Sequence, residues 1–135
     1  MITYALDTSI VSFILKGDED LLARSLQETA NLNRVVMPPA VLYEIRRWLI
    51  FNNSGKRSEM FEKLCGKLLV ENMSVNAFEI AATEHARLKR DGYTLGDADI
   101  LIAGYCVDNN YTLVTNNTKH YSLIDDLYIE DWTAD

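Results

Sequence analysis

Residues 2–9 read ITYALDTS, an apolar run that stops at Asp7 and continues into two hydroxyl side chains. A helical apolar pattern follows directly. In open α/β folds, a central strand delivers polar residues in this way to the carboxyl edge of the sheet, where ligands bind. The segment therefore predicts a buried strand over Thr3–Leu6, with Asp7 at a ligand-binding edge. Either Thr8 or Ser9 is expected to cap the helix that follows.

Short strands and amphipathic helices alternate along the rest of the chain. Further strands are predicted at Arg34–Met37, within Val70–Val75, at Thr112–Thr115 and at Tyr128–Ile129. Helices are predicted at Ile10–Leu15, Glu19–Thr29, Ala40–Phe51, Arg57–Leu69, Ala77–Arg90 and Gly96–Val107. Strands that alternate with helices imply a mostly parallel sheet covered on both faces. The pattern contains no linker or internal repeat, so residues 1–135 are expected to form one domain.

The composition limits the class of protein. The chain has 135 residues, 48% of them hydrophobic, and a formal net charge of -7. It contains no apolar run of membrane-spanning length and no signal-peptide pattern at its N-terminus, so a cytoplasmic protein without a membrane segment is expected. The negative charge counts against passive nucleic-acid binding, although basic residues gather between Arg34 and Lys67. Cys65 and Cys106 lack histidines at ligand spacing, which disfavours a zinc site.

Acidic residues recur where predicted strands end. Asp99 lies in the first turn of its helix, where the helix dipole tolerates a negative charge. Asp97 is interpreted as the cap of that helix, because residues two apart do not share a helix face. Asn117 follows a later strand and is expected at the same edge of the sheet as Asp7. The pattern therefore predicts that Asp7 and Asp99 meet at one edge, with Asn117 nearby.

Glu44 lies inside a predicted helix, about one turn after Pro39. By itself this position is typical of a solvated helix face. Its neighbours Val41, Ile45 and Trp48 mark the face that is expected to point inward. Glu44 is therefore also consistent with a carboxylate at the rim of the core that points along the sheet edge, and both interpretations stay open.

Several carboxylates gathered in one place repel one another, and burial increases the cost of their charges. A cation would compensate for that cost, and an all-oxygen ligand set suits Mg²⁺ or Mn²⁺ better than zinc. The chemistry that such a site supports is metal-assisted hydrolysis of a phosphodiester bond. The hydroxyl groups of Thr8, Ser9 and Thr115 are placed to hydrogen-bond a carboxylate or a substrate phosphate, although capping and turn formation also explain them.

Three segments and two single residues together resemble a known family. They are YALDTS at residues 4–9, Glu44, GDADILIAG at residues 96–104, and LVTNN at residues 113–117 followed by Trp132. In this order they resemble the PIN-domain ribonucleases and, more narrowly, the VapC toxins of VapBC toxin–antitoxin pairs. The resemblance spans nearly the whole chain. It implies an α/β fold, a single three-layer αβα sandwich that is PIN-like, with a mostly parallel sheet of four or five strands.

The resemblance also implies roles for individual residues. Asp7, Glu44 and Asp99 would be the catalytic and metal-binding acids of an Mg²⁺- or Mn²⁺-dependent endoribonuclease. A fourth position that is often acidic in the family falls on Asn117, which leaves one-metal catalysis open. The residues expected to support the site are Thr8, Ser9, Asp97, Thr115 and Asn117. A serine that often precedes the mid-chain glutamate in the family is absent from this region.

Partners are implied in the same way. The resemblance implies a homodimer and a VapB-like antitoxin whose C-terminal segment blocks the site, with DNA bound only through the antitoxin. Family members with a similar C-terminal tail resemble toxins that cut initiator tRNA in the anticodon loop, so tRNA is the expected substrate. The residues expected to contact the RNA backbone are Arg46, Arg47, Lys56 and Arg57. The same segment is also consistent with a pair of solvated helices, or with a surface for a partner.

Two other classes of protein fit parts of the pattern. An aspartate at the end of a first strand is also the reactive group of phosphatases and receiver domains that transfer phosphate through aspartate. Those proteins need a second acid two residues later, where Ser9 stands, or a late lysine, for which Lys119 is the candidate. The other alternative is a non-catalytic module whose acids dock a basic partner.

Overall fold

The strand predicted first, β1 (Thr3–Leu6), lies at the centre of a parallel sheet with the order β3-β2-β1-β4-β5. Its neighbours are β2 (Arg34–Met37) and β4 (Thr112–Val114), and the edge strands are β3 (Leu69–Val70) and β5 (Tyr128–Glu130). All four residues of β1 are buried. The computed structural model describes residues 1–133, so the predicted boundary at residue 135 lies outside the described residues.

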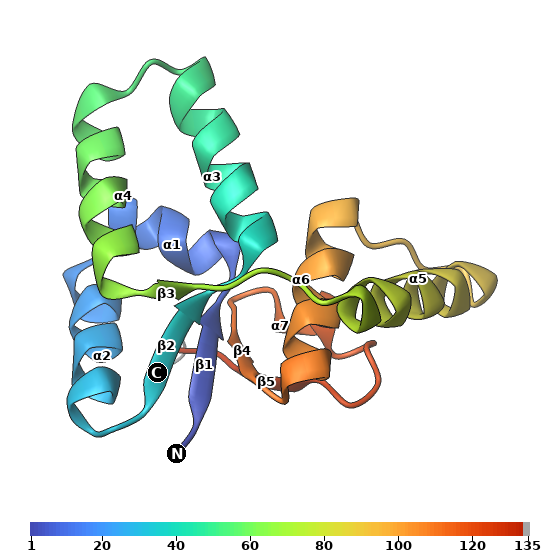
Figure 1. Cartoon of the computed structure of the whole chain (residues 1–135). Coiled ribbons are helices and arrows are strands. Elements are labelled where there is room, and N and C mark those ends of the chain that lie inside the picture. Colours follow the sequence, from blue (N-terminus) through green and yellow to red (C-terminus); the bar gives the residue numbers. More distant parts are fainter. Residues whose placement is uncertain (134–135) are drawn as a thin grey trace.

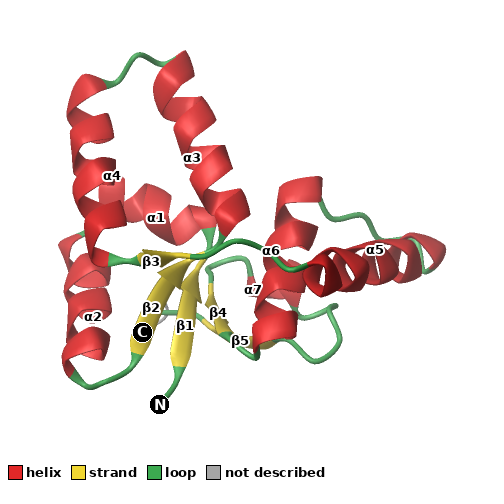
Figure 2. Cartoon of the chain, viewed as in Figure 1, coloured by secondary structure: helices red, strands yellow, loops and turns green. Residues whose placement is uncertain are grey.

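Helices cover the sheet on both sides. They are α1 (Thr8–Leu15), α2 (Glu19–Ala30), α3 (Pro39–Phe51), α4 (Gly55–Lys67), α5 (Val75–Arg90), α6 (Asp97–Asn109) and α7 (Thr118–Tyr121). In Figure 1, α1, α2 and α4 gather at one side of the strands and α5 and α6 at the other, while α3 and α4 extend beyond the sheet as a helical hairpin. Figure 2 shows the strands enclosed between these helices. The predicted α/β sandwich is confirmed, with five parallel strands.

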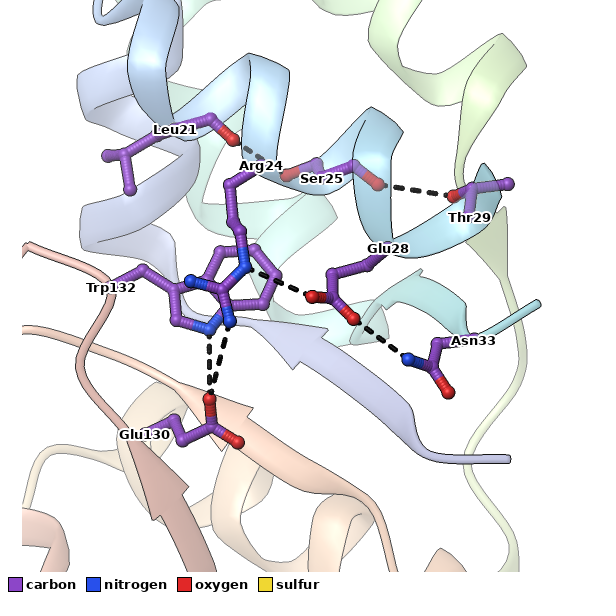
Figure 3. A network of polar contacts seen from close by, with 8 residues as sticks. All are labelled: Leu21, Arg24, Ser25, Glu28, Thr29, Asn33, Glu130 and Trp132. Atoms are coloured by element: carbon purple, nitrogen blue, oxygen red, sulfur yellow. Dashed lines mark hydrogen bonds and ion pairs between the residues drawn. The ribbon is translucent and has the colours of Figure 1, made fainter. Parts of the chain in front are cut away.

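A polar network fastens the C-terminal part of the described chain to α2 (Figure 3). The Arg24 guanidinium lies 3.1 Å from a Glu28 carboxylate oxygen and 3.8 Å from one of Glu130, and its carbon is 4.7 Å from the centre of the Trp132 ring. Trp132 also packs edge-on against Tyr4 of β1, with ring centroids 5.2 Å apart. These contacts fasten β5 and the segment after it to α2 and β1. Within residues 1–133, no helix combines the length and apolar character needed to span a bilayer.

The buried face of helix α5 matches the predicted one only in part. The expected inward residues were Phe78, Ala81, Ala82, His85 and Leu88. Ala81 and Leu88 are buried as predicted, but the other buried residues are Ala77 and Glu84. The reason lies in α6, where a Cβ atom added at Gly104 would lie 2.6 Å from the Ala77 carbonyl oxygen and 2.9 Å from the Ala81 Cβ. The two helix backbones approach so closely that only small side chains fit between them, and Phe78 is left half exposed.

Several predicted boundaries were also wrong. Asp7 itself caps α1, because its backbone is extended and its carboxylate accepts from the Thr8 amide; aspartate caps helices as well as serine or threonine. We expected Asn76 to cap α5, but Ser74 is the cap. The edge strand is Leu69–Val70, which overlaps the predicted Val70–Val75 segment only at Val70. Trp48 is 40% exposed because α3 projects beyond the sheet.

Candidate active site

The two central strands bring Asp7 and Thr115 together at the carboxyl edge of the sheet. Strands β1 and β4 pair in parallel with Leu6 opposite Val114, so the residues that follow them emerge side by side. The Asp7 amide donates a hydrogen bond of 2.9 Å to the Val114 carbonyl, which extends this pairing by one residue. The Thr115 hydroxyl then reaches the Asp7 carboxylate across the gap between the strand ends, at 2.7 Å.

The Asp7 carboxylate is 4% exposed and accepts four hydrogen bonds. Its Oδ1 atom accepts from the Thr8 amide at 2.8 Å and from the Tyr121 hydroxyl at 3.2 Å. Its Oδ2 atom accepts from the Thr115 hydroxyl at 2.7 Å and from the Ser9 hydroxyl at 3.4 Å. The predicted supporting roles of Thr8, Ser9 and Thr115 thus correspond to direct contacts with this carboxylate.

Asp99 shares one of these donors with Asp7. It lies in the first turn of α6, and its Oδ1 atom also accepts from the Tyr121 hydroxyl at 3.2 Å. Because one hydroxyl oxygen touches both carboxylates, the two acids lie within roughly two hydrogen-bond lengths of each other. The structure therefore brings together Asp7 and Asp99, which are far apart in the sequence, as predicted.

Glu44 stands next to this pair, linked to it through Thr8. The Thr8 hydroxyl donates to Glu44 Oε1 at 2.5 Å, while the Thr8 amide donates to Asp7. On its other side, Glu44 Oε2 lies 3.6 Å from an Arg47 nitrogen, and the Glu44 side chain is 19% exposed. The sequence left Glu44 open between a solvated face and the rim of the core, and the structure places it at the rim.

Burial and mutual repulsion make the acid pair electrostatically costly. Burial raises the pKa of Asp7 above its ordinary value, and the hydrogen bonds from Thr115, Thr8 and Tyr121 offset part of that increase. The pKa of Asp99 is also raised, first by burial and then by the negative charge of Asp7. The charge of Glu44 raises both values further. A positive charge placed between these acids would relieve this cost.

The donor set fits a hard divalent cation that keeps much of its water. Within residues 1–133, no group of three or more histidine, cysteine, aspartate or glutamate side chains is arranged to hold a metal ion. Mg²⁺ is commonly bound by only one or two carboxylates, with water as its remaining ligands. The pair of Asp7 and Asp99 meets that requirement, whereas direct binding by Glu44 stays a prediction.

Two predicted supporting residues lie differently from the others. Asp97 is exposed and is the first residue of α6, so Gly96 and not Asp97 is the N-cap. Asn117 acts through its backbone, because its amide donates to the Thr115 hydroxyl at 2.9 Å. That bond turns the Thr115 hydroxyl proton toward Asp7, so Asn117 supports the site without a carboxylate of its own.

Sequence reasoning missed Tyr121. Its side chain is fully buried in α7, a four-residue helix, and its hydroxyl lies 3.2 Å from a carboxylate oxygen of each acid, so the two acids share its single proton. Such a short helix produces no periodic apolar pattern. The available signal was a large aromatic residue with a polar tip soon after a central strand ends, and aromatic hydroxyls of this kind usually find a partner when buried.

Two hollows meet at Glu44 and Arg47, which line both of them. The larger, about 570 Å³, is also lined by Asp97 and Asp99 and by several apolar side chains. Its apolar lining includes Pro39, Tyr43, Met73 and Phe78. The smaller, about 220 Å³, is the basic hollow, which contains Lys16, Arg47 and Arg57 beside Thr8 and Glu44. Anionic substrate segments on either side of the acids would thus meet different surroundings.

The predicted RNA-contacting residues divide between two environments. Arg47 and Arg57 line the basic hollow, where the Arg57 guanidinium lies over the Trp48 ring at 5.4 Å. Arg46 instead pairs with Glu62 of α4 and lies 5.0 Å from the Phe61 ring centre. Its contacts hold the α3–α4 hairpin together, while Lys56 is exposed at the start of α4.

Comparison with known proteins defines the class to which this fold and site correspond. A family model described as the PIN domain matches residues 4–125. The chain is 30% identical to the tRNA(fMet)-specific endonuclease VapC of Shigella flexneri, over 98% of this chain and 100% of that protein. The chain therefore belongs to the PIN domain family and, within it, to the VapC group.

Solved structures of other proteins have the same fold as this chain. The VapBC2 complex of Rickettsia felis, bound to a DNA fragment from its promoter, matches with a TM-score of 0.87 and 24% identity, covering 97% of this chain and 99% of that one. The DNA-bound VapBC complex of Salmonella typhimurium matches with a TM-score of 0.83 and 26% identity, covering 98% of this chain and 99% of that one. The expected PIN-like fold is confirmed.

Proposed function

We propose that the protein is an endoribonuclease toxin that uses Mg²⁺ or Mn²⁺ to hydrolyse RNA phosphodiester bonds. The observation that carries the proposal is the meeting of Asp7 and Asp99 on one buried hydroxyl at the carboxyl edge of the sheet. Membership of the VapC group supports the same activity, since the Shigella flexneri relative is an endonuclease. An RNA substrate also implies action in the cytoplasm.

The acids would divide the chemistry between them. Asp7 and Asp99 would hold the ion, which stabilises charge on the phosphate and on the leaving oxygen when it is bound. Glu44 is linked to Asp7 through Thr8 and accepts a hydrogen bond from the Thr8 hydroxyl on one oxygen, so lone pairs remain to take a proton from the attacking water. The water oxygen then bonds to phosphorus as the bond to the leaving oxygen breaks. We also propose that Asp97 supports the site as a polar side chain lining the larger hollow.

The basic hollow supports RNA binding beside the acids. Lys16, Arg47 and Arg57 line it in a chain whose overall charge is -7, so positive charge is concentrated where a phosphate backbone would pass. We propose Arg47 and Arg57 as the principal backbone contacts and Lys56 as a peripheral one. Arg46, predicted alongside them, lines neither hollow and pairs with Glu62 of α4.

The name of the Shigella flexneri relative, a tRNA(fMet)-specific endonuclease, supports initiator tRNA as the substrate to test first. A VapB-like antitoxin is the proposed partner, since the Salmonella typhimurium relative forms a DNA-bound VapBC complex, and DNA would be bound through that antitoxin. A homodimer is proposed because Tyr43 and Phe78 leave apolar surface exposed beside the larger hollow. Light scattering on the purified chain measures the dimer directly.

The decisive experiment compares Asp7→Asn with wild type on transcribed initiator tRNA and on unrelated RNA, with Mg²⁺ and with a chelator. The variant is expected to fold, because the hydroxyls of Thr115 and Ser9 can rotate to accept from an amide nitrogen. Cleavage should disappear in the variant and in chelator. Cleavage by Asp7→Asn at the wild-type rate would exclude the proposed site. In a separate assay, formation of an acyl-phosphate on Asp7 of the wild-type protein would favour the alternative of phosphotransfer through aspartate.

A further inference from the structure

We propose that Tyr121 is a positioning residue that holds Asp7 and Asp99 at the spacing required by the divalent cation; the inference rests on the proposed function. Its hydroxyl lies 3.2 Å from Oδ1 of each acid. Among the four donors to Asp7, Tyr121 is the one that also reaches Asp99. It thereby couples two side chains from different elements, one after β1 and one in α6.

The remaining contacts of Asp7 leave room for both the hydroxyl and an ion. A carboxylate offers about four lone-pair positions, and four donors approach those of Asp7. The Ser9 hydroxyl is the most distant, at 3.4 Å, and is free to rotate, so one position is only weakly filled. The donors from Thr8 and Thr115 are short and anchor the carboxylate to the backbone around it.

Tyr121 approaches the acids from the side away from solvent. Its side chain is 0% exposed and Asp7 is 4% exposed, so the hydroxyl and its ring fill the interior behind the carboxylates. Asp99 and Glu44, in contrast, line the larger hollow of about 570 Å³. An ion and an RNA phosphate would enter from the hollow, where the tyrosine does not obstruct them.

Loss of the hydroxyl would leave the two acids without a common anchor. Their mutual repulsion would then separate them before an ion arrives, and the ion would have to draw them together again. Removing a hydrogen bond from a metal-binding carboxylate typically weakens metal binding by about 10- to 100-fold. The same loss should be recovered when the metal concentration is raised, because the ligands themselves are unchanged.

The test is a Mn²⁺ titration of Tyr121→Phe, followed by thermal unfolding in the absence of RNA. Phenylalanine keeps the buried ring and removes only the hydroxyl. The matched control is Tyr105→Phe: Tyr105 is also fully buried, and its hydroxyl donates at 3.0 Å to a carboxylate oxygen of Glu71, away from the acid pair. Both variants lose one buried hydroxyl bonded to a carboxylate.

The Mn²⁺ concentration at half-maximal stabilisation should rise about 10- to 100-fold in Tyr121→Phe and stay at the wild-type value in Tyr105→Phe. RNA cleavage by Tyr121→Phe should approach the wild-type rate at saturating Mn²⁺. An unchanged or lower Mn²⁺ midpoint in Tyr121→Phe would overturn the positioning role. The proposed function would still hold in that case if wild type cleaves RNA and Asp7→Asn does not. A wild-type chain that neither responds to Mn²⁺ nor cleaves RNA would remove the proposed function itself.

Discussion

Two clusters of carboxylates and tyrosines lie at either end of α6. They differ in the number of hydroxyl donors available to each carboxylate. In the first, one carboxylate, Glu71, accepts from the hydroxyls of Tyr105 at 3.0 Å and Tyr111 at 2.8 Å, and it lies 3.8 Å from an Arg34 nitrogen. In the second, one hydroxyl, that of Tyr121, serves the two carboxylates of Asp7 and Asp99.

The difference distinguishes a structural contact from the proposed ion-binding site. Around Glu71, two donors and a cation satisfy a single negative charge, and the cluster ties the segment after β3 to α6 and β4. Around Asp7 and Asp99, two negative charges share a donor, and burial raises the pKa of each carboxyl. A protein retains such a deficit of positive charge where a ligand supplies it. The predictions below test whether the two clusters differ in this way.

The largest expected effect is stabilisation by metal at the second cluster alone. Saturating Mn²⁺, at about 100 times its dissociation constant, should raise the free energy of unfolding by about 2.7 kcal/mol. Asp7→Asn should abolish that gain, because it removes a charge from the ion-binding pair. Chemical denaturation with and without Mn²⁺ measures both quantities. Equal Mn²⁺ responses in the two proteins would mean that the ion binds elsewhere.

A smaller effect is expected at the first cluster. Glu71→Ala leaves the buried hydroxyls of Tyr105 and Tyr111 without their carboxylate acceptor, which should lower the free energy of unfolding by about 1–3 kcal/mol. The increment produced by Mn²⁺ should stay at its wild-type value, because the acid pair is intact. Denaturation of the variant with and without Mn²⁺ separates the two. A lost Mn²⁺ response would show that the clusters are coupled through α6.

The smallest effect is the pH dependence of the metal-free protein. The folded pKa values of Asp7 and Asp99 lie above the ordinary value of 3.8, so the folded chain binds more protons than the unfolded chain between those values. The free energy of unfolding should therefore fall as pH rises through that window. In chelator, the free energy of unfolding of Asp7→Asn should fall less steeply with pH than that of wild type. A wild-type curve that falls no more steeply than that of the variant would contradict the raised pKa values.

Asp108 provides an opposite reference for the same measurement. Hydrogen bonds from Asn76 and Ser74 lower its pKa, so its stabilising contribution is present above the ordinary value and is lost as pH falls through the lowered one. Asp108→Asn should remove a small rise in stability with pH and leave the fall caused by the acid pair.

The sequence predicted those parts of the site that follow from strand endings. The apolar run before Asp7, the first-turn position of Asp99 and the place of Glu44 beside an inward helix face are local patterns, and the structure brings these residues together as expected. Tyr121 was missed because α7 is too short to have a period. Phe78 was wrongly placed on the inward face of α5 because the close approach at Gly104, which allows only small side chains there, involves another helix. The Arg46–Glu62 pair likewise depends on how α3 and α4 pack.

The sheet order also sets when the site comes into being during synthesis. Strand β1 is made first, yet one of its two neighbours is β4, and the groups that hold Asp7 follow β4 at Thr115 and Tyr121. A nascent chain on the ribosome therefore carries its first acid long before it can complete the site. If the protein cuts RNA as proposed, the nascent chain cannot cleave the RNA of the translation machinery before Tyr121 has been translated.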